Sequence, residues 1–131
     1  GKEQAFEYAH ELIVTRDMHE RKRLMFERAD AFLALPGGIG TLEELVEQLT
    51  WVQLNRHRKP VMVLNIAGFW DPLLRLFDHM QSSGFVNVGR PIRMLVAHNV
   101  RAVMPKLATA LSNVPEAELH GEAAEQVLDR M

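Results

Sequence analysis

The stretch Pro36-Gly37-Gly38-Ile39-Gly40-Thr41-Leu42-Glu43-Glu44 decides how the rest of this sequence is interpreted. It follows an apolar run at residues 31–35, which predicts a buried strand, and leads into an amphipathic run at residues 42–54, which predicts a helix. Glycines let backbone N–H groups approach an anion, and a helix N-terminus carries partial positive charge. The spacing matches neither the P-loop nor the dinucleotide fingerprint, so it indicates phosphate binding and no more.

Strands and helices alternate on both sides of this stretch. Apolar runs predict strands at residues 11–15, 31–35, 61–65 and 94–97, and helical patterns cover residues 18–28, 42–54, 71–82 and 100–111. Three helix starts carry capping signals, which are Asp17 with Glu20, Thr41 with Glu44, and Asp71 as N-cap with Pro72 at the first helical position.

This alternation predicts an α/β fold with a Rossmann-like, doubly wound parallel sheet covered by helices on both faces. Helices in such a fold run antiparallel to the strands. The helices that start at Met18 and Leu42 should therefore begin at the carboxyl edge of the sheet, where ligands bind. Arg21, Lys22, the glycine loop and Glu44 would then share one end of the domain.

The sequence predicts one main domain. Residues 1–111 are expected to form the C-terminal part of a Rossmann-like nucleotide-binding domain, and residues 112–131 an appended helix or tail. Four strands make a thin sheet, and a helical pattern begins abruptly near residue 4. We therefore expect the N-terminal strands of the fold, one or two βαβ units of about 30 residues each, to be absent from this chain.

Composition excludes several classes of function. A net charge of −2 over 131 residues gives no bulk electrostatic case for nucleic acid or an acidic membrane, and no apolar run reaches the roughly 18 residues that span a bilayer. The absence of cysteine excludes disulfides, thiolate metal sites and a thiol nucleophile, and fits a cytoplasmic protein. Histidines are scattered with no metal-binding spacing, so neither a catalytic metal nor a cofactor is predicted.

Two motifs together carry a family resemblance. Met18-His19-Glu20-Arg21-Lys22, followed by the glycine stretch, resembles the paired signature of the Lonely Guy family, whose members are cytokinin-activating nucleoside 5′-monophosphate phosphoribohydrolases often labelled as lysine decarboxylases. Similar residues recur at 51–54, 57, 59–60, 64–65 and 68–71, so the resemblance covers roughly residues 5–110. It implies cleavage of a plain or N6-substituted adenosine 5′-monophosphate into free base and ribose 5-phosphate by a homo-oligomer, a dimer or larger.

The resemblance also assigns residues. Arg21 and Glu44 match the family's catalytic pair, and the expected substrate-binding residues are Met18, Lys22, Gly37, Gly38, Gly40 and Thr41. The family's first strands, with a further glycine-rich segment that helps to hold the nucleotide, have no counterpart here. A polypeptide of only these residues is therefore expected to be inactive.

Each assignment has a structural alternative. From spacing alone, Glu44 closes a capping box on the Thr41 N–H, whereas the resemblance favours a carboxylate that activates water or stabilises positive charge. Arg21 either binds Glu44, ribose or phosphate, or is a solvated arginine. Lys22 either attracts phosphate or covers apolar surface with its stem. Thr41 either bonds phosphate or caps its helix.

Other residues and functions carry less weight. His57 is more often structural in such a turn, and Phe69 and Trp70 more often pack than line a base pocket. The second function considered is a catalytically silent nucleotide-binding or sensing module, against which the retention of both catalytic residues argues. A pyridoxal-dependent lysine decarboxylase needs a Schiff-base lysine in a pocket, and no such setting surrounds Lys2, Lys22, Lys59 or Lys106.

Overall fold

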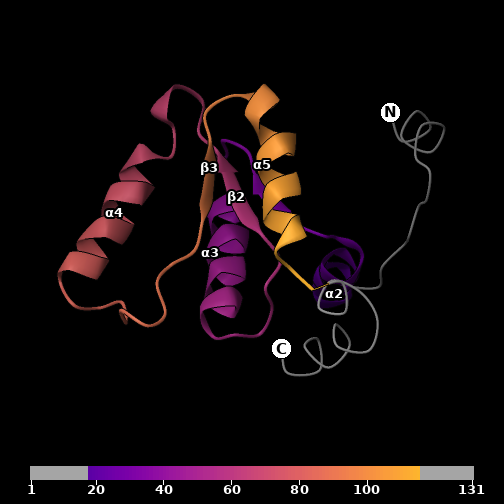
Figure 1. Ribbon diagram of the computed structural model, residues 1–131, viewed down its shortest axis with the longest axis horizontal. Helices are drawn as coiled ribbons and strands as arrows, with labels where there is room; N and C mark the ends of the chain where they lie inside the picture. The colour runs from indigo at the N-terminus through magenta and orange to yellow at the C-terminus, as the bar shows by residue number, and fades with distance from the viewer. Residues whose placement is uncertain (1–17, 116–131) are drawn as a thin grey trace.

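The computed structural model describes residues 18–115, which form a parallel α/β sheet. Its three described strands are β1 (Phe32–Ala34), β2 (Val61–Leu64) and β3 (Leu95–Ala97), ordered β1-β2-β3 and all parallel (Figure 1). This confirms the Rossmann-like class and three of the four predicted strands. The remaining one, at residues 11–15, lies outside the described residues, as do the Asp17 cap and most of the expected C-terminal helix or tail.

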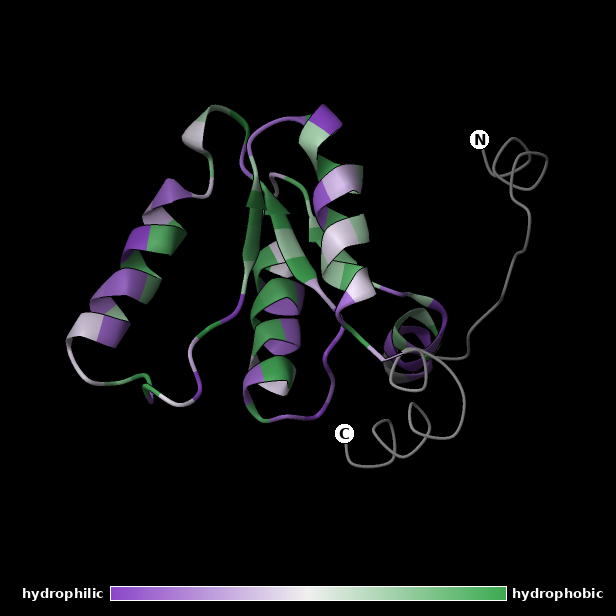
Figure 2. Ribbon diagram, viewed as in Figure 1, coloured by the Kyte–Doolittle hydropathy of each residue, from purple (hydrophilic) through white to green (hydrophobic). Residues whose placement is uncertain are grey.

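Helices cover both faces of β2, whose side chains are all buried. Val61 and Val63 pack in one apolar cluster with residues of α3 (Ile39–Gln53) and α4 (Asp71–Ser82), while Met62 and Leu64 pack against α5 (Val100–Ser112). Figure 2 shows the apolar strands enclosed between helices of mixed hydropathy. The sheet is thus doubly wound, with helices on both faces. The glycine loop connects the end of β1 to the first turn of α3.

The start of α3 differs from the sequence prediction. The helix begins at Ile39, so Thr41 lies inside its first turn and cannot be the N-cap. Gly38 takes that position with an extended backbone, and its carbonyl accepts the Leu42 N–H at 3.1 Å. Because glycine has no side chain, the N-terminus of α3 has no side-chain cap. The predicted capping box is wrong, and the correction leaves this helix end open.

The turn before α4 is also shifted by one residue. Trp70 is the N-cap, and Asp71 and Pro72 occupy the first two helical positions. The Asp71 carboxylate accepts a hydrogen bond from Asn65 Nδ2 at 2.8 Å, and Asn65 Oδ1 accepts the Trp70 N–H at 2.7 Å. Gly68 has φ +71, and a Cβ there would lie 2.6 Å from the Asp71 carboxylate. Asn65, rather than Asp71, therefore fixes this turn.

Helix α2 (Met18–Arg28) has its predicted bounds but not its predicted direction. Figure 1 draws it nearly end-on, beyond the lower ends of the strands, whereas α3, α4 and α5 run alongside the sheet. Its last turn contacts Lys59, two residues before β2 begins. The expectation that α2 runs antiparallel to the strands from the carboxyl edge is therefore wrong, because the helix lies across the amino edge instead of running beside the sheet.

Helix α5 follows its predicted range, with an N-cap that the sequence analysis did not single out. Asn99 Oδ1 accepts the Ala102 N–H at 3.0 Å. Pro105 lies at the sixth position of the helix, beyond the first turn, where proline is normally confined. The helix continues to Ser112, so the proline does not end it.

Candidate functional site

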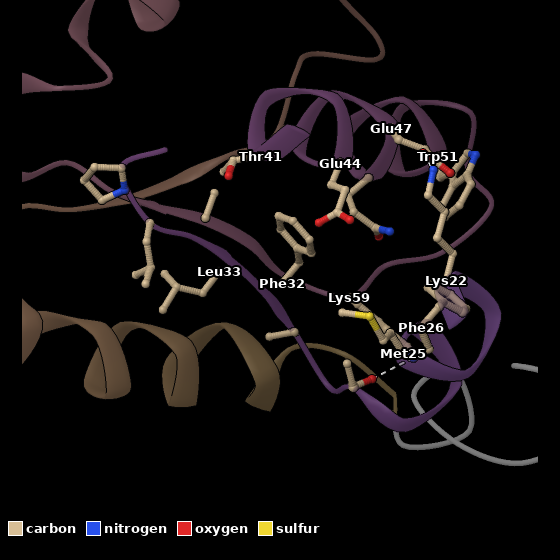
Figure 3. A pocket seen from close by; sticks show the side chains of 16 residues that line it. Lys22, Met25, Phe26, Phe32, Leu33, Thr41, Glu44, Glu47, Trp51 and Lys59 are labelled. Carbon is tan, nitrogen blue, oxygen red and sulfur yellow. Dashed lines mark hydrogen bonds and ion pairs between the residues drawn. The ribbon is translucent and has the colours of Figure 1, made fainter. Parts of the chain in front are cut away.

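A cavity of about 560 Å³ runs along the side of β1. Residues 31–36 form its floor, α3 forms one wall, and α2 contributes Lys22, Met25 and Phe26 (Figure 3). One end of the cavity meets the start of α3, and the other end meets Lys59. The cavity therefore extends from the carboxyl edge of the sheet to its amino edge, and side chains of α2 contribute to its lining.

The glycine loop leaves an open helix N-terminus beside this cavity. A Cβ on Gly37 would lie 2.4 Å from the Thr41 hydroxyl oxygen, so only glycine lets Thr41 keep its place. A Cβ on Gly38 or Gly40 would meet nothing within 4 Å. Together with the missing side-chain cap on α3, this open space leaves the first-turn N–H groups accessible to an anion.

Glu44 and Thr41 both line the cavity. Figure 3 shows the Glu44 carboxylate pointing from α3 toward the Phe32 ring of β1. Glu44 follows Ile39 by five residues, which corresponds to about 7.5 Å along the helix axis. A carboxylate is therefore placed one to two turns beyond the open N-terminus, on the wall of the same cavity.

Lys22 is held by an ion pair with α3. Its Nζ donates to Glu47 Oε2 at 3.0 Å and lies 3.8 Å from Glu43 Oε1. The hydrogen bond to Glu47, followed by the charge of Glu47, raises the pKa of Lys22. Lys22 therefore stays charged but is largely compensated, an arrangement that neither sequence alternative included.

Arg21 occupies a different environment from its neighbour. Its side chain is exposed on α2, and it is not among the residues that line the cavity. Met18 begins α2, but its side chain lies outside the described residues. Of the expected site residues, the cavity thus brings together Lys22, Thr41 and Glu44, with the three glycines at one end and Arg21 outside its lining.

The two aromatic residues after β2 lie away from this cavity. Trp70 is buried in the core with only 5% of its surface exposed, and Phe69 is exposed and packs edge-on against it at 4.9 Å between ring centroids. Neither lines the cavity. The packing alternative therefore describes Trp70, while the aromatic side chains that do line the cavity are Phe26, Phe32 and Trp51.

The burial of two polar residues was not predicted, although His57 was interpreted as structural; of the two, Lys59 lines the cavity and His57 does not. His57 and Lys59 are each only 4% exposed, although they fall in a run of five polar residues that predicts a solvated turn. The Lys59 backbone N–H donates to His57 Nδ1 at 3.1 Å. Their residue types gave no sign of burial, because histidine and lysine are mostly exposed or only partly buried.

Burial of His57 makes stability depend on pH. Desolvation, with a smaller contribution from the Lys59 charge, lowers the pKa of His57 to about 4 from 6.5. Between these values the unfolded chain binds a proton that the folded chain does not. Stability from this group is therefore complete above pH 6.5 and decreases by about 3 kcal/mol as the pH falls to 4.

Urea unfolding between pH 4 and 7 measures this effect. His57→Gln should flatten the pH dependence in that window, whereas His98→Gln, at an exposed position, should leave it unchanged. An equal pH dependence in wild type and His57→Gln would contradict the assignment.

Two features are absent from residues 18–115. No group of three or more histidine, cysteine, aspartate or glutamate side chains in this range could hold a metal ion. No helix in the same range combines the length and the apolar character that crossing a membrane requires.

Comparisons with known proteins give one consistent result. A family described as "Possible lysine decarboxylase" matches residues 1–107. A probable cytokinin riboside 5′-monophosphate phosphoribohydrolase of rice, Oryza sativa subsp. japonica, is 47% identical over 97 residues, which are 74% of this chain and 42% of the relative. A second rice enzyme, a cytokinin riboside 5′-monophosphate phosphoribohydrolase, is 48% identical over 102 residues, 78% of this chain and 41% of its own length.

A bacterial relative extends the comparison beyond plants. The cytokinin riboside 5′-monophosphate phosphoribohydrolase of Rhodococcoides fascians is 44% identical over 94 residues, 72% of this chain and 48% of the relative. The chain thus spans less than half the length of these relatives.

Proposed function

The chain belongs to the family described as possible lysine decarboxylases, and on this premise we propose that its full-length protein is a nucleoside 5′-monophosphate phosphoribohydrolase. It hydrolyses the N-glycosidic bond of adenosine 5′-monophosphates, plain or N6-substituted, to free base and ribose 5-phosphate. The observation that carries the proposal is Glu44 on the cavity wall, just beyond the uncapped glycine-rich start of α3. The names of the related proteins support the same reaction.

The 5′-phosphate binds at the start of α3. The loop at Gly37, Gly38 and Gly40 offers backbone N–H groups, and the space above Gly38 and Gly40 is open. The helix dipole adds a favourable interaction with the negative charge. The Thr41 hydroxyl, on the cavity side of the same turn, donates to a phosphate oxygen.

Glu44 then acts at the sugar. Water adds to C1′, the bond from C1′ to the base nitrogen breaks, and the electron pair of that bond leaves with the base. The transition state resembles an oxocarbenium ion, which a carboxylate stabilises. Glu44 also accepts the proton that the attacking water loses, and the departing base gains a proton in turn.

Arg21 contributes a cation from outside the cavity lining. It is exposed at the start of α2, next to the ion-paired Lys22. Its planar guanidinium matches carboxylate or phosphate oxygens, so it orients Glu44 or binds the ribose phosphate once substrate is present. Lys22 supports the site through Glu47, which holds α2 against α3.

A decarboxylase activity is not proposed, despite the family description. The lysine amines within residues 18–115 all donate to protein acceptors: Lys22 to Glu47, Lys59 to the carbonyls of Phe26 and Ala29, and Lys106 to the Val96 carbonyl. A Schiff-base lysine instead needs its amine directed at a cofactor in a pocket.

We also propose that the protein is a cytoplasmic homo-oligomer. Large apolar side chains remain exposed on α3 and α4, including Ile39, Val46 and Leu76, and a second copy would cover them. Light scattering of the full-length protein measures its mass directly. A monomer at micromolar concentration would contradict this part of the proposal.

Product analysis by chromatography tests the reaction. The full-length protein is incubated with AMP and with isopentenyladenosine monophosphate, and we expect free base and ribose 5-phosphate in equal amounts. The ratio of the two rates identifies the preferred base. Nucleotide binding without base release would favour the silent binding module. If the protein neither binds nor cleaves either nucleotide, the assignment of the glycine loop is wrong.

A further inference from the structure

The C-terminal end of α2 is held by a buried lysine from another part of the chain. Lys59 Nζ donates to the backbone carbonyls of Phe26 at 2.5 Å and Ala29 at 2.7 Å. It also lies 4.0 Å from the centroid of the Phe26 ring. Helix ends leave carbonyls without intrahelical partners, and a cation there satisfies them and complements the helix dipole.

Lys59 is itself fixed to the sheet. Its backbone N–H donates to His57 Nδ1, and the carbonyl of the next residue, Pro60, accepts the Phe32 N–H of β1 at 2.9 Å. Lys59 therefore sits where β2 begins and has little freedom to move. Its amine therefore holds the end of α2 at a fixed position relative to the sheet.

Aromatic packing joins the same anchor to α3. The Phe26 ring packs edge-on against His57 at 5.0 Å and against Trp51 of α3 at 6.2 Å between centroids. About one turn before Phe26, near the middle of α2, Lys22 is paired with Glu47 of α3. The side chains of the Lys22–Glu47 pair are 32% and 27% exposed, so solvent screens this ion pair in part, whereas Lys59 is only 4% exposed. The buried anchor therefore determines most of the placement of α2.

We propose that Lys59 is a positioning residue that holds α2, and with it Arg21, in register with Glu44 on α3. Arg21 precedes Phe26 by five residues on one short helix, so a shift at the anchored end moves both together. The catalytic consequence rests on the proposed function. The anchoring of α2 by Lys59 does not, and it can be tested without activity.

The test compares three variants of the full-length protein. Lys59→Met keeps the apolar stem but removes both hydrogen bonds, and Lys59→Arg keeps a charged donor. Lys106→Met is the matched control, because Lys106 also donates to a backbone carbonyl, that of Val96 at 2.6 Å, but from α5. Amide hydrogen exchange of residues 18–28 and the values of kcat and KM are measured for each.

We expect Lys59→Met to raise exchange in α2 at least tenfold, with α3 and α5 unchanged, and to lower kcat about tenfold with KM within twofold. Lys59→Arg should recover part of both, and Lys106→Met should change neither. Unchanged exchange in α2, or a uniform rise across all helices with kcat falling only as the folded fraction falls, would overturn the proposal.

If Lys59→Met does not fold, Lys59→Arg decides, since protection of α2 and kcat must then fall together while the melting temperature is kept. If wild type shows no turnover, the proposed function fails, and hydrogen exchange alone decides whether Lys59 anchors α2.

Discussion

Replacing Glu44 with glutamine should lower kcat for base release about a thousand-fold, within the range that a positioned acid or base contributes. Glutamine keeps the size of the side chain on the cavity wall but removes the charge that stabilises an oxocarbenium-like state. Glu44 is exposed and is not the cap of α3, so the variant should fold normally. Because the phosphate site lies at the helix start, nucleotide affinity should change by less than about threefold, which corresponds to about 0.7 kcal/mol.

Glu43 provides the matched control for this experiment. It precedes Glu44 on the same helix, its side chain is 71% exposed, and it does not line the cavity. Its ion pair with Lys22 is long, at 3.8 Å, and such exposed pairs are worth little. Glu43→Gln should therefore retain kcat within twofold. Equal losses in both variants would indicate a general charge effect, and full activity in Glu44→Gln would remove this carboxylate from the mechanism.

The sheet could be predicted from the sequence because its signals are local. The apolar runs at 31–35, 61–65 and 94–97 each contain the observed strand. This relation is clearest for β2, which is buried at every residue, because a strand buried on both faces must be apolar throughout. The extent of α2 and α5 followed from periodicity in the same way. Local patterns carry this information because each element needs a continuous apolar face.

The position of α2 could not be predicted by the same means. It depends on Lys59, which is separated from Phe26 by 33 positions and whose residue type gives no sign of burial. The antiparallel expectation applied a general rule for βαβ units and missed this contact. The predicted start of α3 was wrong for a related reason. A threonine followed by glutamate three residues later predicts a capping box, but the helix begins earlier, with Gly38 at the N-cap position. In both cases a tertiary or backbone feature prevailed over side-chain pattern.

The open glycine loop yields the second large effect. Gly38→Val should weaken nucleotide binding about a thousand-fold, because a branched side chain would fill the space where the phosphate approaches the start of α3. Loss of two charge-assisted hydrogen bonds, at roughly 1.5–3 kcal/mol each, accounts for this magnitude. Gly38 has an extended backbone with negative φ, and nothing lies within 4 Å of a Cβ there. The free energy of unfolding should therefore change by less than about 1 kcal/mol, the usual range for an unconstrained surface substitution.

Gly37 separates this effect on the ligand from an effect on the fold. A Cβ at Gly37 would lie 2.4 Å from Thr41 Oγ1 and 3.0 Å from Thr41 Cβ, so Gly37→Ala must displace the first turn of α3 even without ligand. Calorimetry with AMP in a Glu44→Gln background measures binding without turnover, and urea unfolding measures stability. We expect Gly38→Val to lose affinity at nearly constant stability and Gly37→Ala to lose both. If Gly38→Val bound AMP like its parent, the phosphate would have to bind elsewhere, because the space beside the α3 N-terminus would then be filled by valine.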